Sequence, residues 1–84
     1  MVPRALAPEG VLPPGFGLGW TIGPASRPAE AARGGESYYD PAGGEWRYFP
    51  GDRWHFPHWD YNPHDAPRSE WRNGPLRPGE PINR

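Results

Sequence analysis

The chain has 84 residues and a mass of 9.4 kDa, which allows one small domain at most. Fourteen prolines and twelve glycines exclude a helical bundle, and the absence of cysteine excludes disulfides and any cysteine-based zinc site. Nine basic residues, all arginine, against ten acidic residues give a formal net charge of −1, which argues against nucleic-acid binding through bulk charge alone.

Residues 1–35 are punctuated by proline and glycine, which predicts an extended arm or linker. Small and large residues alternate over residues 15–20, so Phe16, Leu18 and Trp20 can lie against a surface. Residues 26–33 favour a short helical turn. No run approaches the roughly 18 apolar residues of a membrane span, and no signal peptide is recognisable. We therefore expect no membrane span, and export by another route or within a larger parent chain.

Aromatic side chains must supply the core of residues 36–84. Ile, Leu, Val and Phe together number only 11 of 84 residues, a share typical of disordered chains. Twelve aromatic residues, five of them tryptophan, can instead bury a large area, and ten of them lie between Tyr38 and Trp71. The sequence therefore predicts a mainly β domain, or a small α+β one, with an aromatic core.

Turn signals divide this region into short strands. Residues 38–40 and 45–49 flank a four-residue turn and predict a β-hairpin. A second turn precedes an extended run over residues 53–61, which Pro57 makes an edge or bulged strand. Residues 69–73 can form one more short strand. Together these segments predict a short antiparallel sheet.

Strand alternation predicts how the polar side chains of the last two strands are arranged. His58 and Asp60 share one face, opposite Trp59 and Tyr61. By the same rule Glu70 and Arg72 share a face. If these strands pair, the histidine, both carboxylates and the arginine gather opposite an aromatic core.

Those four side-chain types match the needs of metal-independent RNA cleavage. A carboxylate can take the proton of the 2′-hydroxyl, a histidine can protonate the leaving 5′-oxygen, and an arginine can stabilise charge on the phosphate. The exposed aromatic rings of Tyr61 and Trp54 can stack on unpaired bases. Residues 58–72 are therefore the candidate active site.

All three histidines lie within residues 55–64, and two other uses of this cluster remain open. His55, His58 and Asp60, with His64 or Asp65 nearby, offer ligands for zinc or a similar divalent metal. A regular strand points His55 and His58 to opposite faces, so a metal site requires a kink at Pro57. The histidines can also be purely structural, and Asp60–Arg72 or Glu70–Arg68 can be ordinary surface ion pairs.

Residues 35–83 resemble the C-terminal toxin domains of bacterial polymorphic and contact-dependent toxins. The matching motifs are Tyr39-Asp40-Pro41-Ala42, Trp46-Arg47-Tyr48-Phe49-Pro50-Gly51-Asp52, His58-Trp59-Asp60-Tyr61-Asn62-Pro63-His64 and Ser69-Glu70-Trp71-Arg72-Asn73. The order Trp-Asp, His, Glu, Arg is similar to that of the colicin ribonucleases. This resemblance implies that the catalytic set is Asp60, His64, Glu70 and Arg72.

His58 and His64 compete for the acid role, and His64 is preferred. Arg68 joins Tyr61 and Trp54 as a candidate substrate-binding residue. The resemblance also implies an RNA substrate, no resident cofactor, a cognate immunity protein and delivery from a secreted parent chain into the cytoplasm of a target cell. The alternative, from another class, is a non-catalytic interaction or assembly module whose aromatic surface docks onto a partner.

Overall fold

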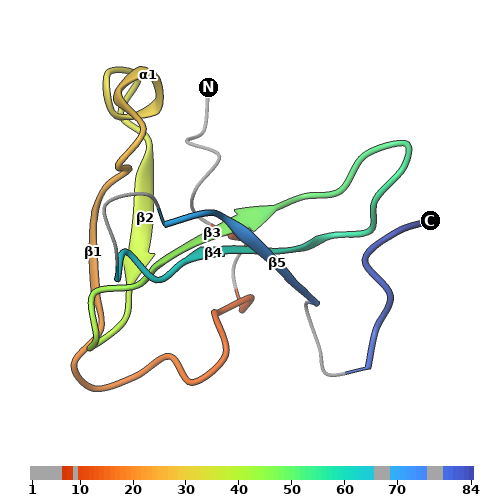
Figure 1. The fold of residues 1–84 in the computed structure, drawn as a ribbon, viewed down its shortest axis with the longest axis horizontal. Coiled ribbons are helices and arrows are strands. Elements are labelled where there is room, and N and C mark those ends of the chain that lie inside the picture. The colour runs from red at the N-terminus through yellow and green to blue at the C-terminus, as the bar shows by residue number, and fades with distance from the viewer. Residues whose placement is uncertain (1–6, 9, 66–68, 76–78) are drawn as a thin grey trace.

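The computed structural model describes residues 7–8, 10–65, 69–75 and 79–84. They form a five-stranded antiparallel sheet in which each strand pairs with the next along the chain (Figure 1). The strands are β1 (Thr21–Pro24), β2 (Glu36–Tyr39), β3 (Glu45–Phe49), β4 (His58–Asn62) and β5 (Arg72–Pro75), and one short helix, α1 (Pro28–Ala31), joins β1 to β2. The predicted mainly β fold with an antiparallel sheet is confirmed.

One face of the sheet is aromatic. Directly opposed residues of antiparallel strands point to the same side, so the register places five rings together: Tyr38, Trp46, Tyr48, Trp59 and Tyr61. Trp59 is completely buried, and its ring meets those of Tyr38 and Tyr48 edge to face at 5.8 and 5.7 Å. The predicted aromatic core is present and centres on Trp59.

The segment before β1 extends this aromatic cluster. Phe16 lies edge-on to Tyr38 with ring centroids 5.6 Å apart, and Trp20 lies 6.0 Å from Trp46. Leu18, between them, is fully exposed, so only the two aromatic residues of the alternating segment pack against the sheet. β1 lies within the predicted arm and is nevertheless a strand, because it pairs along its whole length with β2.

The opposite face of the sheet is polar. Glu45 and Arg47 of β3 alternate with the aromatic residues, and Arg47 is opposed to Asp60 of β4. Nε2 of His58 lies 3.3 Å from Oδ1 of Asp60, so these two side chains share this face as predicted. The helix α1 is joined to the same face by an ion pair between Glu30 and Arg47. In β3 and β4 the charged side chains of Glu45, Arg47 and Asp60 therefore lie on the opposite face from the rings of Trp46, Tyr48, Trp59 and Tyr61.

The predicted turn between β2 and β3 is organised by one carboxylate. Oδ1 of Asp40 accepts hydrogen bonds from the backbone N–H groups of Ala42 and Gly44, at 3.0 and 2.8 Å. Oδ2 accepts one from Nε1 of Trp46 at 3.0 Å. The turn is thus connected both to its own backbone and to the aromatic face.

Gly44 is the position in this turn where a side chain does not fit. A Cβ there would lie 2.7 Å from Oδ2 of Asp40 and 2.7 Å from a ring carbon of Tyr61. We expect Gly44→Ala to lower the free energy of unfolding by about 1–3 kcal/mol, because overpacking displaces both neighbours. Urea denaturation measures the effect. Gly17→Ala is the control, since its Cβ meets nothing within 4 Å, and equal losses in both variants would contradict the prediction.

Two predicted strand boundaries are wrong. The run predicted over residues 53–61 begins as a strand only at His58, because Asp52 closes a turn: its Oδ1 accepts the N–H groups of Trp54 and His55, each at 2.8 Å. The strand predicted over residues 69–73 is instead β5, which starts at Arg72. Side-chain capping decides the first boundary and pairing with β4 decides the second.

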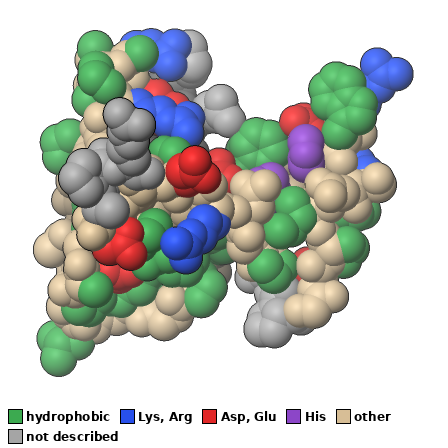
Figure 2. All heavy atoms as spheres, viewed as in Figure 1, with side chains coloured by type: hydrophobic (Ala, Val, Ile, Leu, Met, Phe, Trp, Pro, Cys, Tyr) green, Lys and Arg blue, Asp and Glu red, His purple; other side chains and the backbone are tan. Residues whose placement is uncertain are grey.

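The connection between β3 and β4 projects from the sheet, and the C-terminal segment runs back beside it (Figure 1). The N–H of Phe56 donates to the carbonyl of Ile82 at 2.8 Å, and that of Arg84 donates to the carbonyl of Trp54 at 2.8 Å. Hydrophobic and histidine side chains gather near the tip of this projection (Figure 2). Trp54 there is 64% exposed.

Candidate functional site

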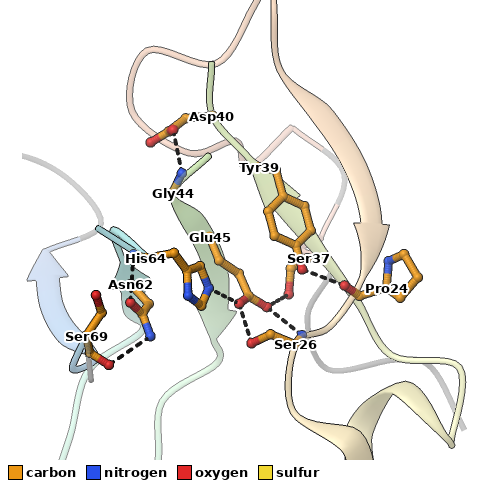
Figure 3. A network of polar contacts seen from close by, with 10 residues as sticks. All are labelled: Pro24, Ser26, Ser37, Tyr39, Asp40, Gly44, Glu45, Asn62, His64 and Ser69. Atoms are coloured by element: carbon orange, nitrogen blue, oxygen red, sulfur yellow. Dashed lines mark hydrogen bonds and ion pairs between the residues drawn. The ribbon is translucent and has the colours of Figure 1, made fainter. Parts of the chain in front are cut away.

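A buried carboxylate is the centre of the candidate site. Glu45 begins β3 and its side chain has no exposed surface. Its two oxygens accept hydrogen bonds from the Ser26 N–H at 3.1 Å and from the hydroxyls of Ser26 and Ser37, each at 2.6 Å. Nε2 of His64 lies 2.8 Å from Oε1. Figure 3 shows these contacts converging on Glu45 from three separate segments of the chain.

These hydrogen bonds determine the charge of Glu45. Burial alone would raise the pKa of this carboxyl, but hydrogen bonds from Ser26, Ser37 and His64 outweigh it and lower the pKa below its ordinary value. Burial, followed by the charge of Glu45, raises the pKa of the neighbouring Tyr39 phenol. Glu45 is therefore a buried anion at neutral pH.

His64 lies between the buried Glu45 carboxylate and the surface. The residue follows β4 with φ at 52°, a left-handed conformation that costs energy outside glycine and often marks functional positions. Its backbone N–H donates to Oδ1 of Asn62 at 3.0 Å, which fixes the turn. The side chain is 36% exposed. With Nε2–H donating to Glu45, Nδ1 becomes the proton-accepting nitrogen of the ring.

An aromatic ring and two arginines lie next to His64. The ring of Trp71 meets that of His64 nearly edge-on, with centroids 6.4 Å apart. The guanidinium carbons of Arg27 and Arg47 lie 5.0 and 5.3 Å from the Trp71 ring centroid. Arg47 is buried on β3 on the same face as Glu45, whereas Arg27 is largely exposed. The site thus combines an oriented imidazole with an aromatic surface and positive charge.

The predicted grouping of Asp60 with Arg72 is wrong. Asp60 is opposed to Asn73 in β5, and Arg72 is opposed to Tyr61. Arg72 therefore belongs to the aromatic side of the sheet and Asp60 to the polar side. The cause is the register of β4 with β5, since a shift of one residue moves every side chain to the other face.

The remaining predicted residues are dispersed. Glu70 is exposed and lies before β5, Tyr61 packs on Trp46 with ring centroids 4.4 Å apart, and Trp54 lies at the projecting tip. Arg68 falls outside the described residues. Of the predicted catalytic set, His64 alone belongs to the Glu45 network.

The other two histidines have local partners. His58 is buried, and its Nδ1 lies 2.8 Å from the carbonyl oxygen of Phe56. His55 pairs with Asp52 at 3.0 Å. Within the described residues, no group of three or more histidine or acidic side chains is placed to hold a metal ion, so His55, His58 and Asp60 are not assembled as ligands.

Four residues around this site were not predicted from the sequence: Glu45, Arg47, Ser26 and Ser37. A usable signal was present for the first two, because the alternation that assigns Trp46 and Tyr48 to the aromatic face assigns their neighbours in β3 to the other face. No such pattern identifies the two serines, because Ser26 and Ser37 lie 19 and 8 residues from Glu45 in the chain.

Comparison of the chain with protein-family models, curated proteins and solved structures found no match. Across the described part of the chain, no helix is both long and apolar enough to cross a membrane. The resemblance to toxin domains therefore stays a hypothesis, which has to be judged on the site itself.

Proposed function

We propose that this chain is an antibacterial toxin domain that cleaves RNA without a metal, by attack of the 2′-hydroxyl on the adjacent phosphate. One observation carries the proposal. An exposed histidine in a strained backbone conformation is held by a buried, ionised carboxylate, beside a tryptophan and an exposed arginine. A carboxylate–histidine pair of this kind is a general acid–base device.

In this proposal the imidazole of His64, rather than a carboxylate, accepts the proton. Glu45 is completely buried, so it cannot reach a substrate and acts as a positioning residue. Nδ1 of His64 takes the proton of the 2′-hydroxyl while the 2′-oxygen forms a bond to phosphorus. The bond from phosphorus to the 5′-oxygen breaks, the leaving oxygen takes a proton from water, and the hydroxide so formed takes the proton back from Nδ1 of His64. The products are a 2′,3′-cyclic phosphate and a 5′-hydroxyl.

The neighbouring groups suit this substrate. The guanidinium of Arg27 can neutralise charge on the phosphate oxygens, and the ring of Trp71 can stack with an unpaired base. Exposed Trp54 offers a second stacking surface at the projecting tip. Delivery by a secreted parent chain, action in a target-cell cytoplasm and neutralisation by an immunity protein belong to the same proposal and rest on the toxin resemblance.

The test is incubation of purified protein with total bacterial RNA, with and without a chelator. We expect cleavage to survive chelation and to fall by about 10²–10⁴-fold in His64→Ala, the loss typical for a general acid or base. Circular dichroism of the variant checks that it is folded. Identification of the cyclic phosphate end distinguishes transesterification from direct hydrolysis.

The other outcomes assign different functions. Cleavage that is lost with chelator and in His55→Ala, but retained in His64→Ala, would favour a metal-dependent nuclease. An absence of cleavage under all conditions would favour the interaction module, for which the exposed aromatic tip around Trp54 is the candidate docking surface.

A further inference from the structure

Two arginines from separate segments converge on one carboxylate next to the His64 site. Oε1 of Glu30 forms an ion pair with a terminal guanidinium nitrogen of Arg47 and lies 3.8 Å from Nη1 of Arg27. Both guanidinium groups also lie over the ring of Trp71. Guanidinium groups arranged around a single oxygen form the type of site that binds phosphate as well as carboxylate.

The three side chains of this cluster, Arg27, Glu30 and Arg47, differ in how far they are buried. Arg47 is 4% exposed and the Glu30 side chain 16%, whereas Arg27 is 49% exposed. Glu30 belongs to α1, a surface helix of four residues with no buried member. Removing the Arg47 guanidinium from water is costly, so its position on the polar face beside Glu45 calls for a partner anion.

We propose that Arg27 and Arg47 form a phosphodiester-binding subsite for RNA, which the Glu30 carboxylate occupies at rest. This inference deepens the ribonuclease proposal and rests on it. Arg47 and Glu45 are two residues apart on β3, roughly 7 Å along a strand, so a phosphate bound here lies next to the His64 site. The Trp71 ring, which contacts both arginines and His64, connects the two places.

Glu30 can leave this position without unfolding α1. Its backbone carbonyl accepts the N–H of Gly35 at 2.8 Å, and a Cβ on Gly35 would lie 2.8 Å from that oxygen. The main chain of Glu30 is therefore fixed by a close approach that glycine permits. Its side chain can still rotate to another rotamer, which removes the carboxylate from between the two guanidinium groups.

The test measures binding of a 2′-deoxy oligonucleotide, which cannot be cleaved by the proposed route. Glu30→Gln removes the competing charge, and we expect it to bind about tenfold more tightly than the wild type, equivalent to about 1.4 kcal/mol. Glu36→Gln makes the same charge change on the opposite face of the sheet and should bind like the wild type. Arg27→Ala, an exposed position, should bind more weakly in an otherwise unchanged protein.

Each outcome decides the proposal. Equal affinity for the oligonucleotide in wild type, Glu30→Gln and Glu36→Gln would overturn the proposal. If Glu30→Gln fails to fold, Arg27→Ala decides, and an affinity equal to that of the wild type would overturn the proposal. Titration with inorganic phosphate shows whether the ligand is a phosphodiester of a nucleic acid or a free phosphate ion. A subsite for RNA should bind the oligonucleotide more tightly than free phosphate. Because binding is measured without cleavage, failure of the ribonuclease assay and failure of this inference are distinguishable.

Discussion

Replacing Trp59 with alanine is expected to lower the free energy of unfolding by about 3–5 kcal/mol, the range for large aromatic residues in a core. Trp59 is the only aromatic residue in the described part of the chain with no exposed surface, and Tyr38 and Tyr48 both pack against it edge to face. A domain of this size has little stability to lose, so the variant should be largely unfolded at 37 °C. Circular dichroism during thermal and urea denaturation measures the change.

Two further tryptophan variants make this test specific. Trp54→Ala removes the same side chain from a 64% exposed position and should change stability by less than about 0.5 kcal/mol. Trp59→Phe should cost less than Trp59→Ala, because it leaves a smaller cavity and removes a buried Nε1–H that has no hydrogen-bond partner among the described residues. Similar losses in Trp54→Ala and Trp59→Ala would contradict a core centred on Trp59.

The parts of the fold that the sequence predicts are those decided by neighbours in the chain. The turn after Asp40 needs only a carboxylate and glycines within four residues, and alternation in β4 needs only the order of its residues. The pairing of β5 is different. Pairing Arg72 with Tyr61 rather than with Asp60 depends on how two strands fit together across the sheet, and composition does not encode that register.

The candidate site likewise combines a residue that the sequence suggests with residues that it does not. His64 is proposed from the sequence through the resemblance to toxin domains, and the end of β4 at Asn62 places it shortly after that strand. The burial of Glu45 could not be predicted, because a charged residue in a strand ordinarily faces solvent. Its partners Ser26 and His64 are each 19 residues away in the chain, on opposite sides of it. Only the folded sheet brings a helix-proximal serine and a loop histidine to one carboxylate.

The separation of the two faces explains how so small a sheet can bear a buried charge. Burial of aromatic rings on one side supplies the stabilisation, with Trp59 at its centre. The polar face can then carry Glu45 and Arg47 at some cost, provided that each has a partner of opposite charge or a set of donors. Such costly, well-partnered charges are the groups expected at a functional site rather than in a purely structural core.

Under the proposed ribonuclease mechanism, replacing Glu45 with glutamine is expected to reduce RNA cleavage by about 10–100-fold, less than the loss of His64 itself, because the imidazole remains but loses the anion that orients it. Glu45 touches no substrate in this scheme, so the rate loss must come with an altered pH–rate profile. The profile of cleavage between pH 4 and 9 is the measurement. Loss of activity with an unchanged profile would mean that Glu45 only supports the fold.

Glu45→Gln should also change how stability depends on pH. The pKa of Glu45 is lowered on folding, since hydrogen bonds from Ser26, Ser37 and His64 outweigh the effect of burial. A carboxyl of this kind stabilises the fold above its ordinary pKa, and this contribution is lost as pH falls through the depressed value. At pH 7 the variant should be less stable than the wild type by about 1–3 kcal/mol, because the hydroxyl donors lose their charged acceptor.

Towards acidic pH this difference should shrink, as the wild type protonates Glu45 and loses the same interaction. Urea denaturation of both proteins at pH 7, 5 and 3 follows the two free energies, and Glu36→Gln controls for the general effect of removing an acidic residue. A constant difference between wild type and Glu45→Gln over this range would mean that Glu45 has the same pKa in the folded and unfolded chains. In that case the hydrogen bonds to Glu45 would hold the sheet together without depressing its pKa, which would contradict the prediction.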